Sequence, residues 1–502
     1  MSSLWIDTSE GTNFPCLEED KKVEVCIIGG GLTGLACAYY LTQAGFSAVL
    51  LEKDKIGSKT SGNTTAKITS QHGLFYDYLA STYGLDASKE YLFSQEKAIQ
   101  DIKEIIEKNN IACDFEIQNN YVYTTKQEEV PLLQKEQKTL EKLSFSSKLE
   151  KEIPLPVSSV LAAIMFPNQA QFHPRKYMFS LCNLIKKNGA SIYENTKVYD
   201  VKKEMDSYLV KTKNYTVSAK YVILATHFPI LNIPGFYFLK MYQETSYLIA
   251  LNAKEPLFPG MYITAKTPTT SFRTAKIDGK ELLLVGGYNH KTGAGIDNKE
   301  AYHTLEKVAK SLYPNAELKY CWNTRDCISV DKIPYIGTYS VTTPGLYVAT
   351  GFKKWGMTNS HVAARILTNL ILGKEENENS IYNSTRFHPI KHQEEVKNIV
   401  KQTYTSLVSL PLKKIKTTIS DLNPGDGKIV EYEGNKIGIY LDEKGNYHAI
   451  KPFCSHLGCT LTFNNLDKTW DCPCHGSRFD CDGHSLYEPS IKDLEMISME
   501  ED

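Results

Sequence analysis

The amino-acid sequence predicts an α/β domain that is interrupted by an antiparallel sheet and followed by a small all-β domain. Residues 23–51 read as strand, helix and strand, which is the pattern of a βαβ unit in a parallel sheet. Residues 240–290 alternate between apolar and polar side chains, as half-buried antiparallel strands do. After about residue 390 the chain turns lysine-rich, and from Gly425 it shows short strands separated by glycine turns.

Each element of the α/β part has its own local signal in the sequence. Val23–Ile28 is a β-branched run that predicts a buried strand, and Leu32–Ala44 predicts a helix that ends at Gly45. Ala48–Leu51 is the next strand, and the Ser- and Thr-rich residues 57–73 predict a loop. Further helices are expected over 86–109, 126–143, 174–187 and 359–372, with a hairpin over 208–219 and buried strands over 221–226 and 346–349.

Composition restricts the possible functions. The 502 residues carry a formal net charge of −1, so no global field favours nucleic acid or an anionic membrane. The first residues lack a basic region followed by an apolar core, and no stretch is apolar enough to span a membrane. We therefore expect a cytoplasmic protein without a membrane span and without a nucleic-acid partner.

A glycine fingerprint marks a nucleotide site. Gly29, Gly31 and Gly34 match G-x-G-x-x-G between the first strand and its helix, and Glu52 ends the second strand. Glycines let the backbone approach a pyrophosphate, the helix N-terminus supplies free N–H groups, and Glu52 can accept hydrogen bonds from a ribose. The fingerprint predicts a Rossmann-like dinucleotide site and leaves FAD and NAD open.

Four further segments decide between the two cofactors by resemblance. Residues 171–174 (QFHP), 221–226 (YVILAT), 331–337 (DKIPYIG) and 345–358 (GLYVATGFKKWGMT) resemble the D-amino-acid oxidase and glycine oxidase superfamily over about residues 20–375. The resemblance implies FAD, with a loop crossing the flavin and one valine beside the adenine. The FAD-binding residues it implies beyond the fingerprint are Ser61, Asn63, Thr64, Thr65, Val198, Ala225, Thr226, Gly351, Phe352, Gly356, Met357 and Thr358.

The same resemblance implies a substrate that is an amine or an amino acid. No second glycine fingerprint is present to suggest a nicotinamide domain. Family members hold a substrate carboxylate with an arginine shortly after a tryptophan, which suggests Arg325 here. If instead Asp326 occupies that position, it would prefer a cationic amine. Arg273 and His290 are the other candidates for the substrate pocket.

The C-terminal domain carries two loops rich in cysteine and histidine. They read CSHLGC over 454–459 and CPCHGS over 472–477, and they resemble the paired loops of Rieske iron–sulfur proteins. The resemblance implies that Cys454 and Cys472 hold one iron, that His456 and His475 hold the other, and that Cys459 and Cys474 form a disulfide. A Cys₂His₂ zinc site is the main alternative, but it normally groups Cys with Cys and His with His.

The expected architecture has three parts. A FAD-dependent body covers residues 1–390, with FAD-binding segments at about 20–80, 170–230 and 325–375 and an inserted substrate domain at about 81–169 and 231–324. A linker covers 391–416, and a Rieske [2Fe–2S] domain covers 417–502.

The expected function is oxidation of an amine or amino acid at FAD, with electrons leaving one at a time through the cluster to a protein or quinone acceptor. Two alternatives remain open: an oxidase that uses O₂ with a structural Rieske domain, and a non-catalytic redox sensor or electron carrier. A Rieske oxygenase is disfavoured because no two-His, one-carboxylate iron motif is found.

Overall fold

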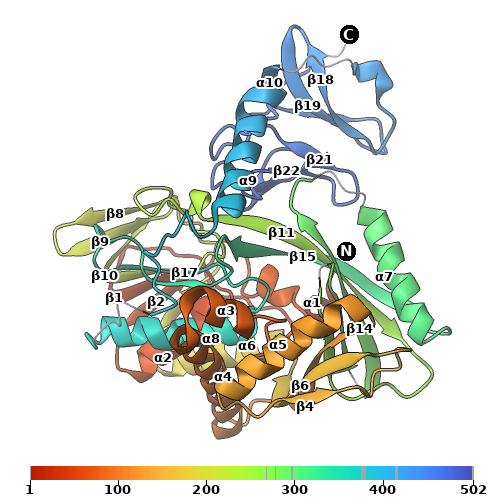
Figure 1. Ribbon diagram of the computed structural model, residues 1–502. Coiled ribbons are helices and arrows are strands. Elements are labelled where there is room, and N and C mark those ends of the chain that lie inside the picture. Colours follow the sequence, from red (N-terminus) through yellow and green to blue (C-terminus); the bar gives the residue numbers. More distant parts are fainter. Residues whose placement is uncertain are drawn as a thin grey trace.

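A large body carries a smaller C-terminal domain on one side in the computed structural model (Figure 1). The structure describes residues 2–266, 268–277, 279–294, 298–374, 380–412 and 417–499. Within these ranges no helix is both long and apolar enough to cross a membrane.

An eight-stranded sheet forms the nucleotide-fold half of the body. Its main path has the order β16-β17-β10-β1-β2-β7, and β8 and β9 extend it from β10. The pairs β1–β2, β1–β10, β2–β7 and β10–β17 are parallel. The strands are β1 (Lys21–Ile28), β2 (Ala48–Leu51), β7 (Ser191–Tyr193), β8 (Asp200–Glu204), β9 (Ser207–Lys211), β10 (Thr216–Leu224), β16 (Tyr335–Thr338) and β17 (Leu346–Thr350).

Alternate residues of β1 serve the two faces of this sheet. Val25 and Ile27 belong to the core shared with three helices, α2 (Leu32–Gln43), α6 (Pro174–Lys187) and α8 (Gly356–Ile371). Cys26 and Ile28 belong to a second core that includes residues of β9 and β10. Burial on both faces explains why the second half of the strand, Val25–Ile28, is a continuous apolar run. The predicted βαβ unit is thus present, with its glycine loop at one edge of the sheet.

A nine-stranded sheet forms the other half of the body. Its main path has the order β15-β11-β14-β13-β12-β4-β6-β3, and β5 pairs with β6. One face packs on the core shared with the nucleotide-fold half, and the other is covered by α7 (Asn298–Leu312). The strands are β3 (Lys67–Ile68), β4 (Glu116–Thr124), β5 (Lys148–Glu150), β6 (Ala162–Gln171), β11 (Met241–Asn252), β12 (Met261–Thr264), β13 (Thr270–Ile277), β14 (Lys280–Lys291) and β15 (Glu317–Ser329).

The remaining helices of the body lie around these sheets. The expected helix over 86–109 is α4 (Leu85–Lys108), and the one over 126–143 is α5 (Val130–Lys142) preceded by the short η2 (Gln127–Glu129). The others are α1 (Leu4–Asp7), η1 (Thr60–Gly62), α3 (Tyr76–Tyr83) and η3 (Tyr237–Leu239).

The C-terminal domain consists of two small antiparallel sheets. The sheet β21–β24 lies nearer the body than β18–β20 (Figure 1). The strands are β18 (Gly427–Tyr432), β19 (Asn435–Leu441), β20 (Tyr447–Ile450), β21 (Thr462–Asn464), β22 (Thr469–Asp471), β23 (Arg478–Phe479) and β24 (Ser485–Tyr487), with η5 (Ile419–Asp421) before them.

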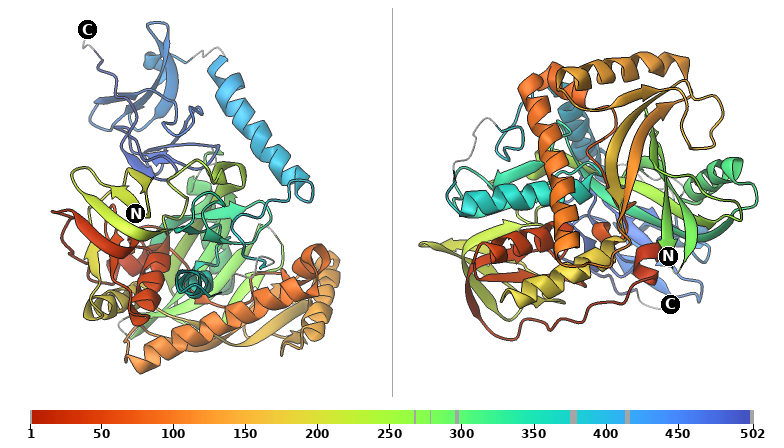
Figure 2. Two further views of the ribbon diagram at one scale, coloured as in Figure 1. Left: turned by 90° about the vertical axis from the view of Figure 1, so that its left-hand side faces the viewer. Right: turned by 90° about the horizontal axis from the view of Figure 1, so that it is seen from below.

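The connection between body and C-terminal domain is largely helical. It contains α9 (Gln393–Tyr404), a π-helical turn η4 (Thr405–Ser409) and α10 (Leu410–Leu412), and it runs along the C-terminal domain (Figure 2). Gln402 donates a hydrogen bond to the Pro473 carbonyl at 2.6 Å, and the Thr460 N–H donates to the Ser406 carbonyl at 3.1 Å. The described part of the linker expected over 391–416 is therefore packed on the domain that it carries, and residues 413–416 lie outside the described residues.

Candidate functional site

A deep pocket opens where the parallel strands of the first sheet end. Residues that follow β1, β2, β10 and β17 line it, and it extends over the second sheet. Carboxyl ends of parallel strands share one edge of a sheet, which is where ligands bind in open α/β folds. The position of the pocket is therefore the one that the glycine fingerprint predicts.

The fingerprint loop is held in a shape that requires glycine. Gly29 has φ +113°, and a side chain there would meet the Ala225 carbonyl at 2.4 Å. A side chain at Gly34 would meet the Gly29 carbonyl at 1.9 Å, so this glycine lets α2 approach the loop. The Glu52 carboxylate accepts the Gly30 N–H at 2.6 Å. Burial raises the pKa of Glu52 to about 7.

Most residues expected to bind FAD lie on the pocket wall. The wall includes Gly29, Gly31, Glu52, Ser61, Thr64, Thr65, Val198, Ala225, Thr226, Gly351, Phe352, Gly356 and Met357. Two buried polar atoms on it, Ser58 Oγ and His227 Nε2, have no hydrogen-bond partner among the described residues. A wall with unsatisfied polar groups and glycines at its narrow points fits a bound dinucleotide.

Three of the expected residues shape the pocket from behind its wall instead. Gly34 provides the close helix approach described above. Asn63 donates to the Lys59 carbonyl at 2.7 Å and so closes its own loop. The Thr358 hydroxyl lies 3.4 Å from the Thr69 carbonyl, to which it donates. We assign these residues to the support of the pocket.

Strand β15 decides which residue of the pair Arg325–Asp326 faces the pocket. Neighbouring residues of a strand point to opposite faces, and it is Thr324 and Asp326 that line the pocket. Arg325 points the other way and pairs with Asp467 of the C-terminal domain at 3.5 Å. The sequence had left this register open, and the structure places Asp326 on the pocket wall and Arg325 off it.

The two other substrate candidates also lie off the wall. Among the described residues, the pocket lining includes neither Arg273 nor His290. Arg273 is 2% exposed and donates to the carbonyls of Thr65 and Ala66, each at 2.8 Å. His290 lies 2.9 Å from the Tyr247 hydroxyl. Arg273 thus fixes the loop that forms the wall, and neither side chain is placed to contact a substrate directly.

The pocket wall around Asp326 is rich in free acceptors. Ser246 Oγ, Asn289 Oδ1 and Thr324 Oγ1 are buried and have no partner among the described residues. Burial raises the pKa of Asp326 to about 6, against the opposing charge of Lys354 and with support from Glu244. Lys354 itself is paired with Glu244 at 2.8 Å. These three groups together carry one negative charge near neutral pH, and Lys353 on the same wall, whose pKa is about 7, offsets part of it.

Several wall residues were not found from the sequence. Lys53 follows Glu52 directly, and Lys353 and Lys354 lie inside the GFKKWG segment, so position in a motif was their only signal. Burial, with the neighbouring Lys332 and Lys354, lowers the pKa of Lys353 to about 7. Residues 487–491 of the C-terminal domain also contribute to the wall, and no pattern in the sequence pointed to them.

The two loops of the C-terminal domain come together as a cysteine–histidine site. The Cys454 and Cys472 sulfurs are in hydrogen-bond contact, and the ring centroids of His456 and His475 lie 5.2 Å apart. Cys459 and Cys474 form a disulfide that joins the loops. The four expected ligand residues and the expected disulfide therefore occur in one place.

The histidines present free nitrogens to this site. The buried Nδ1 atoms of His456 and His475 have no partner among the described residues. His456 Nε2 lies 2.5 Å from the Asn232 side-chain oxygen, which only accepts, so Nε2 carries the proton and Nδ1 keeps its lone pair. Two thiols beside two imidazoles with free lone pairs fit a [2Fe–2S] cluster of the mixed type.

The histidine side of this site is turned toward the body. Phe238 lies 6.1 Å from the His456 ring and 5.9 Å from the His475 ring, and Phe228 lies 6.4 Å from His475. Phe228 directly follows His227, which lines the pocket. The two candidate sites are therefore joined through one short stretch of chain.

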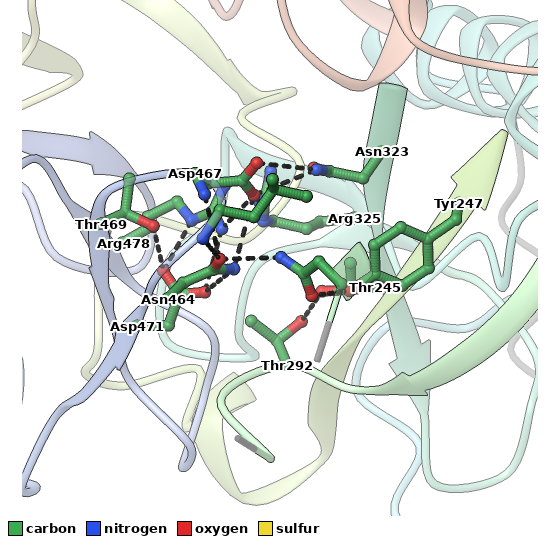
Figure 3. Close-up of polar contacts among 12 residues, drawn as sticks. Thr245, Tyr247, Thr292, Asn323, Arg325, Asn464, Asp467, Thr469, Asp471 and Arg478 are labelled. Atoms are coloured by element: carbon green, nitrogen blue, oxygen red, sulfur yellow. Dashed lines mark hydrogen bonds and ion pairs between the residues drawn. The ribbon is translucent and has the colours of Figure 1, made fainter. Parts of the chain in front are cut away.

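A network of buried charges holds the two domains together (Figure 3). The Asp467 carboxylate accepts from Arg478 at 2.7 Å and from Asn323 at 3.0 Å, in addition to its contact with Arg325. Asp471 pairs with Arg478 at 2.6 Å. Arg325 and Arg478 are 2% and 5% exposed, so both depend on these acids to compensate their charge.

A nucleotide pocket on a two-sheet body and a cysteine–histidine pair of loops beside it define a flavin-dependent oxidoreductase with an iron–sulfur centre. The chain belongs to the family of FAD dependent oxidoreductases, whose model matches residues 24–370, and its residues 415–498 match the Rieske [2Fe-2S] domain. The two cofactors inferred from the motifs, FAD and a Rieske cluster, are thereby confirmed.

Known proteins are similar to the whole of this chain or to its FAD-dependent body alone. The Rieske 2Fe-2S iron-sulfur protein YhfW of Bacillus subtilis is 37% identical over 99% of this chain and 98% of its own length. Gamma-glutamylputrescine oxidoreductase of Escherichia coli is 22% identical over 72% of this chain and 87% of its own. Among solved structures, glycine oxidase of Geobacillus kaustophilus superposes with a TM-score of 0.64 at 20% identity, covering 73% of this chain and 100% of its own.

Proposed function

We propose that this enzyme oxidises a small cationic amine in the pocket and passes the electrons one at a time through the Rieske cluster to a protein or quinone acceptor. The observation that carries the substrate class is Asp326, which faces the pocket while Arg325 faces away. A buried carboxylate binds an ammonium group by a charge-assisted hydrogen bond. No arginine lies on the described wall to hold a carboxylate, and two lysines of the wall have other partners, Lys354 the Glu244 carboxylate and Lys353 the Phe75 ring.

The acceptors near Asp326 support the same substrate class. An ammonium group has several N–H donors, and Ser246, Asn289 and Thr324 offer oxygens that lack partners. Together with Asp326 they would bind the amine and orient its carbon–nitrogen bond. The similarity to gamma-glutamylputrescine oxidoreductase, a protein named for an amine substrate, also supports an amine as the substrate of this enzyme.

The residues that would hold the cofactors follow from the two sites. The fingerprint glycines and Glu52 would bind the adenosine diphosphate half of FAD, and residues 351–357 would lie at its ring. Cys454 and Cys472 would hold one iron, and His456 and His475 the other. Bound FAD supplies two-electron acceptance from the amine, and the cluster supplies one-electron transfer.

The packing of the cluster histidines supports electron flow inside the chain. Phe228, Asn232 and Phe238 of the body contact the rings of His456 and His475. His475 is buried, whereas His456 stays partly exposed, so an external acceptor could still approach the cluster from the His456 side. The arrangement therefore favours the flavin as the electron donor of the cluster over the alternative of a purely structural Rieske domain.

Anaerobic mixing of the purified enzyme with a panel of primary and secondary amines and α-amino acids tests the proposal. We expect amines to bleach the flavin band and then to change the cluster absorption, with amino acids that lack a second amine less effective. Hydrogen peroxide formed in air before the cluster is reduced would favour the oxidase alternative. No flavin reduction by any amine or amino acid would favour the electron carrier.

A further inference from the structure

A segment of the C-terminal domain forms part of the wall of the flavin pocket. Tyr487, Glu488, Ser490 and Ile491 lie on this wall together with Glu52 and Val198. The segment begins at the last residue of β24 and is about 290 residues away from Val198 in the chain. It lies outside the region that matches the FAD-dependent family. Its place on the wall is independent of the substrate proposed above.

An ion pair joins this segment to the fingerprint region. The Lys53 ammonium lies 2.5 Å from the Glu488 carboxylate, and their side chains are 17% and 12% exposed. Lys53 also donates to the Leu486 carbonyl at 3.0 Å. Burial opposes the charge of Lys53, but Glu488 and neighbouring acids hold its pKa above the ordinary value. The Lys53 ammonium therefore remains charged at neutral pH.

An apolar contact lies beside this ion pair. Ile491 packs against the core cluster that contains Ile28, Leu51 and Val198. Ile28 precedes the fingerprint, Leu51 precedes Glu52, and Val198 is the residue expected beside the adenine. The segment thus closes the adenosine end of the pocket with one charged and one apolar contact.

The position of the segment is fixed by its own domain as well. Ser490 N–H donates to the Ser477 hydroxyl at 3.0 Å, and the hydroxyls of Ser490 and Ser455 lie 2.6 Å apart. Gln243 of the body donates to the Glu488 carbonyl at 2.9 Å. Ser455 and Ser477 belong to the two cluster loops, so the folded Rieske domain presents this wall as a formed surface.

We propose that the Rieske domain is a structural part of the FAD site and encloses the adenosine half of the cofactor. FAD would be bound between two domains, and its release would require residues 487–491 to move away from Lys53 and Val198. Enclosure by a second domain slows dissociation because these contacts must break before the cofactor can leave. Loading of FAD would precede or accompany docking of the Rieske domain.

Release of FAD from full-length variants tests this proposal. Glu488→Lys places two cations together, and we expect FAD to dissociate about tenfold faster or more, because a broken buried pair leaves an uncompensated charge. The rate is followed by the fluorescence of free FAD after dilution. The electron paramagnetic resonance signal of the cluster, read on the same samples, reports whether the Rieske domain is folded.

Charge exchange and a surface control make the result specific. The double variant Lys53→Glu, Glu488→Lys restores the pair and should return FAD release toward the original rate. Glu495→Lys disrupts the exposed pair with Lys451 in the same domain and should leave the rate unchanged. Where the lysine variant loses the cluster signal, Glu488→Gln decides, since it removes the charge at nearly constant size.

Two results would overturn the proposal. One is unchanged FAD release in Glu488→Lys or Glu488→Gln with the cluster intact. The other is faster release that the charge exchange does not reverse. Neither result bears on amine oxidation, which is read from flavin reduction.

Discussion

Replacement of Asp326 by asparagine tests the basis of the proposed substrate class. The substitution keeps the size of the side chain and removes the negative charge that faces the pocket. A hydrogen bond to a charged group contributes about 1.5–3 kcal/mol, which corresponds to about 10- to 150-fold in the dissociation constant of an amine. FAD content should not change, because Asp326 lies at the substrate end of the pocket.

The pH dependence of amine binding follows from the same residue. Burial raises the pKa of Asp326 to about 6, so the carboxylate is charged above that pH and neutral below it. Amine affinity should therefore rise as pH increases through about 6 and level off where the carboxylate is fully ionised. In Asp326→Asn this rise should be lost, because the amide does not titrate.

Anaerobic titration of the flavin absorption with a reducing or inhibitory amine measures both effects. Glu317→Gln is the matched control, since Glu317 lies at the exposed end of the same strand and pairs only with Lys319 among the contacts described. Equal amine affinity in Asp326→Asn and the original enzyme would refute the assignment. So would retention of the pH dependence in the variant, because another group would then carry it.

Three further predictions concern the cofactors and the domain contact. Glu52→Ala should lower the FAD-to-protein ratio after gel filtration, because the Gly30 N–H loses its acceptor and the ribose loses one too; normal FAD content would contradict this. His475→Ala should abolish the Rieske paramagnetic signal because one iron loses a ligand, and stoichiometric zinc without iron in the original protein would refute the cluster ligation. Asp467→Ala should lower the free energy of unfolding by about 1–3 kcal/mol, read from urea titration of the cluster absorption, because it leaves buried Arg325 without its acid; an unchanged value would mean that water replaces the carboxylate.

The two cofactor sites could be predicted from the sequence because each depends on local chemistry. The glycines at 29, 31 and 34 and the loops CSHLGC and CPCHGS specify backbone shape and ligand type within a few residues, so spacing alone carries the information. Helices such as α6 (Pro174–Lys187) begin and end at residues that can be recognised locally, a proline at the start and a glycine just past the end.

The second sheet of the body could be predicted only in part from the sequence. Residues 240–290 alternate clearly, but β4, β6 and β15 join them from distant parts of the chain. Which strands pair depends on contacts between residues far apart in sequence, and periodicity does not encode such partners. The strand β15 also continues to Ser329, past the boundary expected at about residue 324.

The sequence by itself determined the domain classes and both cofactors, and it suggested the residues that would bind them, because each rests on a short motif. The tertiary structure alone decided that Asp326 faces the pocket and Arg325 faces Asp467, because a shift of one residue along a strand exchanges the two faces. It alone placed Glu488 of the Rieske domain on Lys53 beside the flavin site, because that contact joins two folded surfaces about 430 residues apart in the chain.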